Sequence, residues 1–410
     1  MNGSPTGDRR TPVEWRLVDL GDPTACAAAR RRSASILTTD PRRHLFHTVD
    51  WLLDATQGRP EDVRAFFLEA ADGTVGYAPL RRQAWRLRFA LGELTLGSRA
   101  LDRLHLMGGA LLGPASAARD ETPLLRALFD AVHAALQARQ VVFLEGVPVD
   151  AALGRLLDGE DRHELPFHVL RHGAPFARHL IRLPASFEDY LGALGRRTRE
   201  GFRRSHRKLV RAVDGRLVLR KVTRPEQVAA FVADATALSR RTYQFHLLGL
   251  GLRDPAALAH SLSVLAARGW TRSYLLELAG APAAFMIGYQ YAGTYHYIDV
   301  GFDPAWQEHS VGTVMHLEVL RELIASEDRP RVFDFSTGTG VHKERFGTEA
   351  RQEANYLLVP RGWRGAVLVG LYRAAERTSA LAVGLADRLR LKAPLKRWLR
   401  RRAARAAPRS

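Results

Sequence analysis

Cysteine is nearly absent from this chain. Among 410 residues only Cys26 is present, so the chain cannot close an internal disulfide or build a cysteine-based zinc site. Residues 278–298 form the longest uncharged run, but its glycines, proline and polar residues favour two strands around a turn over a membrane span. Residues 1–15 are polar and lack a signal-like apolar stretch, which together with the cysteine count predicts a cytoplasmic protein.

Acidic residues are scarce in two segments. Residues 196–211 carry eight basic residues and one acid, and residues 388–409 carry ten basic residues and no acid. Outside these segments, basic and acidic residues are nearly equal in number. The net charge of +18 is therefore carried by two appendages, which indicates an anionic partner or, equally, solvated helix faces.

The apolar pattern of the second half predicts a three-strand meander over residues 271–279, 283–292 and 294–302. A helix over residues 311–325 and strands over 332–336 and 355–359 follow. The first half shows a similar order, with strands over 65–71 and 74–81, a longer strand pair over 85–96, a helix over 123–138 and a strand over 141–144. The two halves thus resemble diverged copies of one unit.

An amphipathic basic helix is predicted between the two halves, over residues 186–214. Ser186 and Asp189 have the spacing of a capping box, and Gly215 provides a stop. We expect its apolar face to pack between the two lobes. The organisation expected from these patterns is an N-terminal lobe (1–185), a basic linking helix (186–215), a C-terminal domain (216–362) and a basic helical tail (363–410).

The loop before the helix at 311–325 is a candidate anion site. Backbone N–H groups of Ser310, Val311, Gly312 and Thr313 would stand at the start of that helix, where the helix dipole favours negative charge. Gly312 would let a pyrophosphate approach the backbone closely. No histidine spacing of a metal site occurs, so no metal is expected.

Residues 187–360 resemble the GNAT acyltransferase superfamily, in its FemAB/CelD-like branch of bacterial envelope and polysaccharide proteins. The resemblance rests on the basic helix, the strand YHYIDVGFD, the loop and helix EHSVGTVMHLEVL, and the stretch FDFSTGTGVHKERFG. In the last stretch, the family's aspartate, glycine and lysine correspond to Asp334, Gly338 and Lys343. His342 departs from the family, which usually has tyrosine there.

The resemblance implies an α/β fold of tandem GNAT-like domains, each a mostly antiparallel sheet flanked by helices. It also implies an acyl carrier bound along splayed strands, with an amine attacking the thioester directly. Such a reaction needs a base for the ammonium and donors for the thioester oxygen. No cysteine nucleophile is implied.

Asp299, Asp334 and Lys343 are the candidate catalytic residues. Period-two alternation places Tyr295, Tyr297 and Asp299 on one strand face, and an acid on an aromatic face has a raised pKa that suits a general base. A structural ion pair is the equally weighted alternative for Asp299. Asp334 is a second acid, or more readily a residue that fixes Lys343 through an ion pair.

The function expected is N-acyl transfer from acyl-CoA, such as acetyl-CoA, to a small-molecule amine of an amino sugar, amino acid or envelope precursor. Tyr295, Tyr297 and Gly338 are expected to contact the substrate. One alternative is a Fem-like transferase that uses aminoacyl-tRNA, held by the basic helix. Another is a non-enzymatic adaptor on an anionic membrane surface, because Leu395, Trp398 and Leu399 have helical spacing in the basic tail.

Overall fold

The computed structural model divides the chain into two compact units. The first contains Met1–Pro175 and Gln352–Arg390, and the second contains Phe176–Arg351. The described residues are 14–40, 42–69, 74–91, 94–112, 120–241, 251–252, 254–338 and 340–388. This division differs from the boundaries predicted at 185, 215 and 362, because the chain returns to the first unit for its last strand and helix.

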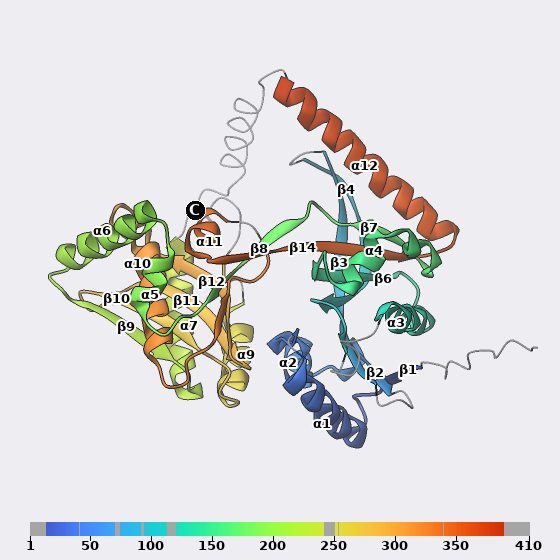
Figure 1. The fold of residues 1–410 in the computed structure, drawn as a ribbon, viewed down its shortest axis with the longest axis horizontal. Coiled ribbons are helices and arrows are strands. Elements are labelled where there is room, and N and C mark those ends of the chain that lie inside the picture. Colours follow the sequence, from blue (N-terminus) through green and yellow to red (C-terminus); the bar gives the residue numbers. More distant parts are fainter. Residues whose placement is uncertain are drawn as a thin grey trace, which may run out of the picture. The chain divides into compact units, whose positions relative to one another are not determined.

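The first unit is built on a mixed sheet (Figure 1). Its strands follow the order β1 (Trp15–Val18), β2 (Val63–Glu69), β3 (Val75–Leu91), β4 (Leu94–Met107), β6 (Gln140–Pro148), β14 (Glu349–Pro360) and β7 (Phe167–Arg171), with β5 (Leu111–Leu112) beside β3. Among these strand pairs only β4 and β6 run parallel. Strand β3 is continuous where the sequence suggested two strands, since it pairs with β2 and then with β4 along its length.

Alternate side chains of this sheet point to opposite faces, and each face packs against its own layer of helices. Phe66 and Leu68 of β2 pack with one helical layer, whereas Ala65 and Phe67 pack with the other. The first layer contains α3 (Thr122–Ala134) and α4 (Ala152–Asp158). The other contains α1 (Pro23–Thr39), α2 (Val49–Ala55) and α12 (Trp363–Arg388). Short 3-10 turns lie at Leu45–His47, Pro60–Asp62 and Glu160–Glu164.

Six strands of the sheet lie in the second unit. The strand order is β8 (Phe176–Arg182), β13 (Val332–Asp334), β12 (Thr294–Phe302), β11 (Ala281–Tyr291), β10 (Ser273–Leu278) and β9 (Leu217–Val222). Within it, β12 and β13 are parallel and the other neighbours antiparallel. The meander and the helix α10 (Val311–Ala325) are confirmed within two residues of the predicted bounds.

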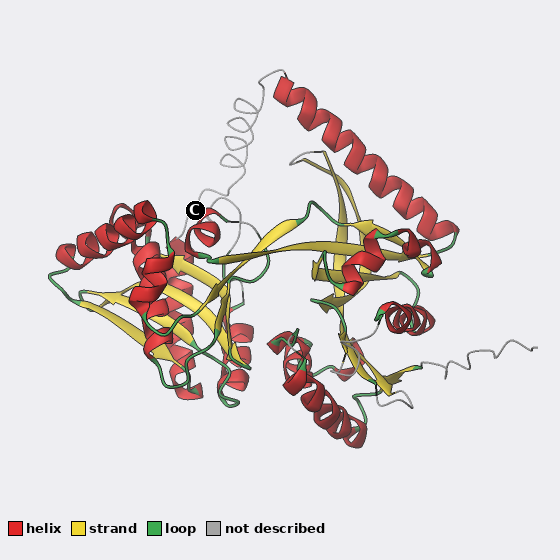
Figure 2. Ribbon diagram, viewed as in Figure 1, coloured by secondary structure: helices red, strands yellow, loops and turns green. Residues whose placement is uncertain are grey.

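Helices cover both faces of this sheet (Figure 2). One face carries α10 with α5 (Phe187–Ala193), α6 (Arg196–Ala212) and α11 (Val341–Phe346). The other carries α7 (Pro225–Arg241), whose apolar side faces β11 and β12, and α9 (Pro255–Ala266), which packs on α7. A short 3-10 turn, η5 (Pro304–His309), leads from β12 to α10.

The basic segment forms two helices rather than the single one predicted. The cap at Ser186 is confirmed, since its hydroxyl accepts a hydrogen bond from the Asp189 N–H at 3.0 Å. Leu194 then takes an extended conformation and ends α5, and α6 begins after Gly195. Phe202 and Leu209 of α6 lie in the core of the second unit, which is where its apolar face packs.

The two units share one chain order. Strands β2, β3 and β4 form a meander, followed by α3 and by β6 parallel to β4; strands β10, β11 and β12 form a meander, followed by α10 and by β13 parallel to β12. This correspondence agrees with the duplication predicted from the sequence. The basic tail after Arg388, including Leu395, Trp398 and Leu399, lies outside the described residues.

Gly288 is the position in the second meander where the sheet admits no side chain. A Cβ atom there would stand 2.1 Å from the Tyr295 hydroxyl oxygen across the β11–β12 pair. We predict that Gly288→Ala lowers the free energy of unfolding by about 1–3 kcal/mol, because the tyrosine ring must leave its place in a packed core. Urea denaturation measures the change.

Gly97→Ala is the matched control for this prediction. Gly97 lies in strand β4, and a Cβ there would meet nothing within 4 Å. An equal loss in both variants would show that glycine removal from a strand, and not the Tyr295 contact, is responsible.

Candidate functional site

In the second unit, backbone pairing between the parallel strands β12 and β13 covers only a short stretch. Pairing between β12 and β13 covers three positions and ends at His296 and Asp334, although β12 continues to Phe302. In the first unit, the corresponding β4 and β6 pair at six positions, up to the last residue of β4. Beyond the last pair in the second unit, the Ser336 hydroxyl donates to the Tyr297 carbonyl at 2.6 Å. In the second unit, regular backbone pairing between these two strands therefore ends earlier than in the first unit, and the region beyond the last pair is named the opening below.

Helix α10 begins beside this opening. Ser310 precedes the helix in a left-handed conformation with φ of 57°, and its side chain makes no capping hydrogen bond. The N–H groups of the first turn are therefore not capped by this side chain, which is the arrangement of an anion site. Val311 is buried, whereas Gly312 and Thr313 are half-buried.

Close packing against Phe302 favours glycine at position 312. A Cβ atom at this position would stand 3.2 Å from the Phe302 ring, so the open side of the glycine faces β12. Close approach of a pyrophosphate, the reason predicted from the sequence, stays a prediction. A phosphate site at residues 310–313 stays a prediction.

The predicted common face of Tyr295, Tyr297 and Asp299 is wrong. A bulge interrupts the β11–β12 ladder, where Ile287 pairs with Asp299 but Gly288 pairs with Tyr297. The extra residue on β12 reverses the alternation. After it, Val300 and Phe302 join the core that contains Tyr295 and Tyr297. Asp299 thus lies on the opposite face, the one that carries His296.

Asp299 is exposed near the outer end of β12. One carboxylate oxygen accepts a hydrogen bond from the Val300 N–H at 2.8 Å. Partial desolvation by the neighbouring atoms raises the pKa of this carboxyl, and the Val300 hydrogen bond opposes the rise. An exposed carboxylate with a raised pKa is available to a substrate as a base.

The two tyrosines are core residues. Tyr295 is fully buried beneath α10, and Tyr297 is buried with its ring 5.5 Å from the His316 ring and 5.7 Å from the Phe335 ring, between centroids. Burial raises the pKa of Tyr297. Tyr297 therefore forms part of the wall beside the opening, whereas Tyr295 fills the sheet interior. Substrate contact by either residue stays a prediction.

Asp334 is held by an arginine that the sequence analysis did not consider. Arg178 of β8 contacts both carboxylate oxygens, with Nε to Oδ1 at 2.9 Å and Nη2 to Oδ2 at 2.5 Å, and both side chains are buried. Oδ1 also accepts the Ser336 N–H at 2.8 Å. The bidentate pair anchors the end of β13 to β8 and favours the structural role of Asp334. Direct participation of Asp334 in catalysis stays a prediction.

Lys343 is buried in α11, near that ion pair. Its ammonium donates to the Thr337 carbonyl at 2.8 Å. An ion pair between Lys343 and Asp334 stays a prediction. Desolvation lowers the pKa of Lys343, although the Asp334 carboxylate opposes the shift. Gly338 takes φ of 92° in the loop that Lys343 contacts, a conformation that favours glycine.

His316 is a candidate residue that the sequence reasoning missed. It lies in the second turn of α10, where Nδ1 donates to the Gly312 carbonyl at 2.8 Å and leaves Nε2 as an acceptor. The side chain is 4% exposed, and Nε2 has no hydrogen-bond partner among the described residues. Desolvation lowers its pKa to about 4, so the ring is neutral near pH 7. Only the tertiary structure reveals this unpartnered acceptor.

His342 faces the same group of rings, with its centroid 5.8 Å from that of His316 and 6.2 Å from that of Tyr297. The side chain is exposed, and partial desolvation lowers its pKa. It stands where the family usually has tyrosine. The opening is thus bordered by aromatic rings, a buried imidazole acceptor and the Lys343 ammonium.

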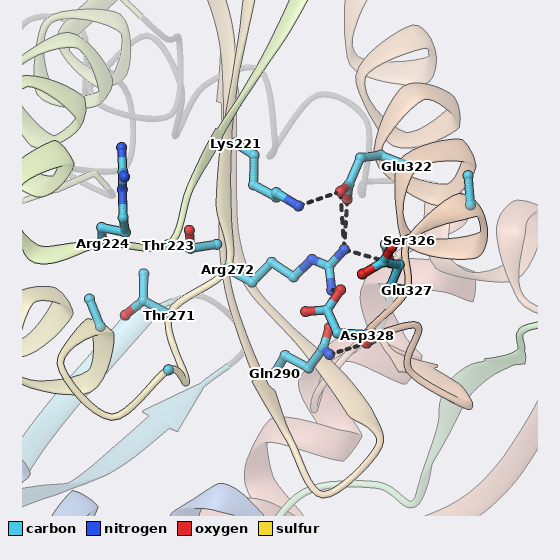
Figure 3. A pocket seen from close by; sticks show the side chains of 13 residues that line it. Lys221, Thr223, Arg224, Thr271, Arg272, Gln290, Glu322, Ser326, Glu327 and Asp328 are labelled. Atoms are coloured by element: carbon cyan, nitrogen blue, oxygen red, sulfur yellow. Dashed lines mark hydrogen bonds and ion pairs between the residues drawn. The ribbon is translucent and has the colours of Figure 1, made fainter.

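A second feature, a cavity of about 820 Å³, lies at the other end of α10 (Figure 3). Helix α10 has 15 residues and is about 22 Å long, so this cavity is remote from the opening. Arg272, the residue just before β10, points toward Glu322, Ser326 and Asp328, and its Nη atoms contact all three at 2.8–3.1 Å.

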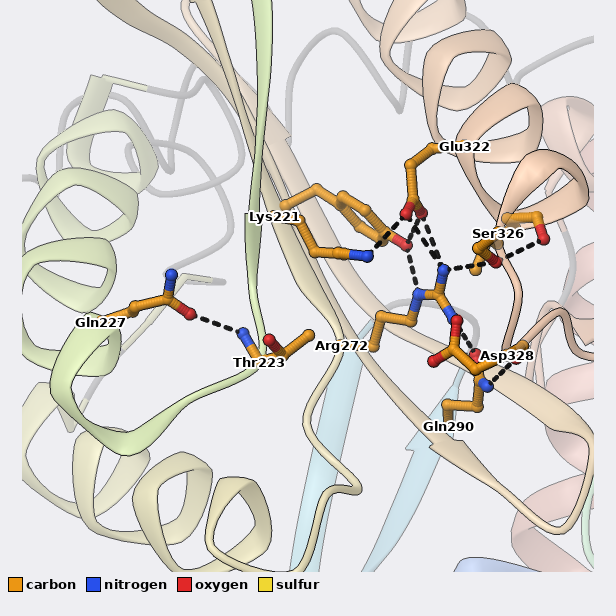
Figure 4. Close-up of polar contacts among 10 residues, drawn as sticks. Lys221, Thr223, Gln227, Arg272, Gln290, Glu322, Ser326 and Asp328 are labelled. Carbon is orange, nitrogen blue, oxygen red and sulfur yellow. Dashed lines mark hydrogen bonds and ion pairs between the residues drawn. The ribbon is translucent and has the colours of Figure 1, made fainter.

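The arginine at this cavity is already fully engaged (Figure 4). Its Nε donates to the Tyr274 hydroxyl at 2.7 Å, and Nη1 donates to Gln290 at 2.6 Å. Tyr274 and Lys221 contact Glu322 as well, at 2.5 and 2.9 Å. Burial alone would raise the pKa of Glu322, but these partners outweigh it and lower the pKa. The network fastens β9, β10 and α10 together and leaves Arg272 no donor for a ligand.

The short parallel pair and helix α10 both lie in the part of the second unit that a family model matches. Residues 196–346 match the model of the acetyltransferase (GNAT) domain family. The chain therefore contains a GNAT acyltransferase domain, and the resemblance seen in its sequence motifs is confirmed.

Solved structures extend the likeness of the fold to most of the chain. The structure of FemX is 12% identical over 80% of this chain and 95% of that chain, with a TM-score of 0.57. A conserved protein of unknown function from Bacteroides thetaiotaomicron is 12% identical over 85% and 100%, with a TM-score of 0.51. No curated protein matches the sequence.

The Arg178–Asp334 pair generates a stability prediction. Asp334→Asn should lower the free energy of unfolding by about 3–5 kcal/mol, because it leaves the Arg178 charge buried without its counter-charge. Chemical denaturation measures the loss. The double variant Arg178→Met, Asp334→Leu should recover much of it, since apolar side chains of similar volume carry no desolvation cost. A double variant as unstable as Asp334→Asn would contradict this account.

Proposed function

We propose that the second unit transfers an acyl group from acyl-CoA to the amine of an amino sugar, an amino acid or a related envelope precursor. The observation that carries the proposal is the separation of β12 from β13 after three paired positions, beside the start of α10. A thioester arm inserted there reaches backbone groups that no partner strand occupies. The first unit keeps its parallel pair closed, which supports a non-catalytic role for it.

The start of α10 suits the phosphate end of the donor. The Thr313 N–H donates to the Ser310 carbonyl at 2.9 Å, so the N–H groups of Val311 and Gly312 are the ones proposed to bind the phosphate, at the positive end of the helix dipole. Exposed cations of α6 stand close by, since the Lys208 ammonium donates to the Glu308 carbonyl at 2.5 Å, just before this loop. The aromatic wall suits the apolar parts of the arm, and His316 Nε2 offers an acceptor for a donor group on it.

The chemical step is direct aminolysis. The amine nitrogen attacks the carbonyl carbon, a C–N bond forms, the C–S bond breaks, and the leaving thiolate gains a proton. Asp299 is the proposed base for the ammonium proton, because it is exposed and its pKa is raised. Lys343 is proposed to stabilise negative charge on the carbonyl oxygen, since its buried ammonium lies beside the opening.

A second donor class is favoured by one observation. Arg197 and Arg204 of α6 and Arg345 of α11 line a cleft of about 550 Å³. Arg345 also stacks on Phe202, with its guanidinium carbon 4.6 Å from the ring centroid. Glu200 and Glu344 line the same cleft, so its three arginines exceed its acids by one. A cleft with this excess of arginine suits a phosphodiester chain, as an aminoacyl-tRNA donor would present.

Binding measurements decide between the two donors. Native mass spectrometry and thermal-shift assays should show a complex and a raised melting temperature with acetyl-CoA or a longer acyl-CoA. Aminoacyl-tRNA should give neither at physiological salt. Binding of the RNA alone would replace the acyl-CoA proposal with the Fem-like one.

Thr313→Glu tests the phosphate site without touching Phe302. Glutamate in the first turn favours the helix but repels a diphosphate, so we predict at least about tenfold weaker CoA binding by calorimetry, with no loss of thermal stability. Thr313→Gln, which has the same shape and no charge, is the matched control and should bind CoA nearly normally. If the two variants bind CoA with equal affinity, the phosphates of the donor do not bind at this loop.

Asp299→Asn tests the proposed base. Its carboxylate form is lost as pH falls through a pKa above the ordinary aspartate value, so wild-type kcat/KM should decline on that acid limb. The variant should lose about two to four orders of magnitude in kcat and the acid limb with it. Because Asp299 is exposed, its stability should change little.

Asp130→Asn is the control for this series, since Asp130 is an exposed carboxylate of α3 in the first unit. It should keep both the rate and the pH profile. If Asp299→Asn keeps full turnover, the base is a group other than Asp299.

A further inference from the structure

Helix α12 exposes an unusual amount of apolar surface. Seven large apolar side chains are exposed among the described residues, and four of them lie on this helix: Trp363 at 74%, Val367 at 56%, Leu371 at 56% and Leu381 at 74%. At 3.6 residues per turn these four positions fall within about 80° of one another around the helix axis. Trp363, Val367 and Leu371 follow one another turn by turn, and Leu381 lies on the same side ten residues further on. These four residues are named the apolar stripe below. Contiguous exposed apolar surface of this kind marks an interaction site.

The stripe is not the side by which α12 is held to its unit. Val369 and Tyr372 are buried and pack against residues of β3, β6, β7 and β14. On the helical wheel these two positions lie opposite the stripe. The helix therefore has two apolar sides, one packed in the core and the other facing outward.

Cations border the stripe along both edges. Arg364 follows one edge, with its guanidinium carbon 5.1 Å from the Trp363 ring centroid, and Arg373 and Arg377 follow the other. Glu376 lies on the packed side, where it interacts with the Tyr372 hydroxyl. The outward surface of the described helix thus combines apolar residues with positive charge.

This pattern is that of a helix that lies in the surface of an anionic bilayer. Apolar side chains enter the acyl boundary, tryptophan sits at the headgroup level, and flanking arginines extend to the phosphates. No described helix is long and apolar enough to cross a membrane. The sequence that follows α12, residues 388–409, adds ten basic residues and no acid, which is the composition that anionic lipids attract.

We propose that α12 docks this protein on an anionic lipid surface through the apolar stripe, with the flanking arginines on lipid phosphates. A partner protein or a second copy of this chain would bury the stripe without needing the arginines along both of its edges. The charge pattern therefore favours lipid. Docking does not depend on the acyl-transfer chemistry, and its test needs no activity measurement.

The test is flotation of the full chain with vesicles of phosphatidylcholine, with or without phosphatidylglycerol. We expect co-flotation with the mixed vesicles, weaker at high salt and much weaker with phosphatidylcholine alone. The variant Trp363→Gln, Val367→Gln, Leu371→Gln keeps the helix and the basic tail but loses the stripe. It should partition roughly tenfold to hundredfold less well. Arg364→Gln, Arg373→Gln, Arg377→Gln should lose about fivefold per arginine at low salt.

The matched control is Arg204→Gln, Arg207→Gln, Arg211→Gln, which removes three exposed arginines from α6 instead. It should float like the wild type. If this control loses binding while the stripe variant keeps it, α6 is the lipid surface and the proposal is overturned. Unchanged binding of the stripe variant overturns it as well.

A local readout places the contact on α12. The fluorescence difference between the wild type and Trp363→Phe isolates this one tryptophan, and it should shift to the blue with mixed vesicles. Sedimentation velocity without lipid tests the alternative that a second copy of this chain covers the apolar stripe. A wild-type oligomer that the stripe variant converts to monomers would identify the stripe as an interface between copies and would overturn the lipid assignment.

Discussion

The buried pair between Arg178 and Asp334 lies where the sheet of the second unit divides. Asp334 is the last residue of β13 that pairs with β12, and its carboxylate is held by β8 on the other side. The pair fixes the end of β13, while the Ser336 hydroxyl occupies the Tyr297 carbonyl just beyond it. The opening and the loop that leads to Lys343 both start from this point. A site that depends on a buried charge pair is rigid only while both partners are present.

The bulge on β12 distributes the candidate groups over two faces of that strand. Tyr297 faces α10, His316 and the aromatic wall, whereas Asp299 lies on the face of His296. The proposed base and the proposed donor wall therefore lie on different faces of β12. This geometry lets an amine approach from one face while the thioester arm is held from the other. In the first unit, the corresponding strand pair has no such opening, so one chain order produces an open site and a closed one.

Charge is used differently at the two ends of α10. At its C-terminal end, every donor of Arg272 is engaged with protein atoms, and that network holds three elements together. At its N-terminal end, the Ser310 side chain does not cap the first turn, and His316 Nε2 has no hydrogen-bond partner among the described residues. A buried polar atom without a partner is costly in a folded protein, so this end of α10 differs from the fully satisfied network at the other end. Helix α12 shows the apolar counterpart, a stripe left uncovered by the unit that holds it.

Local patterns in the sequence determined the second meander, the bounds of α10, the cap at Ser186 and the GNAT motif around Lys343, because each depends on residues close together in the chain. Other features depend on partners far apart in sequence. The Arg178–Asp334 contact joins residues 156 positions apart, and the face of Asp299 follows from a register shift against β11. The return of the chain to the first unit is likewise a matter of strand pairing. Only the tertiary structure decided these three features. Period-two alternation in a sequence does not reveal a bulge, and the sequence around an arginine does not reveal which distant carboxylate it will pair with.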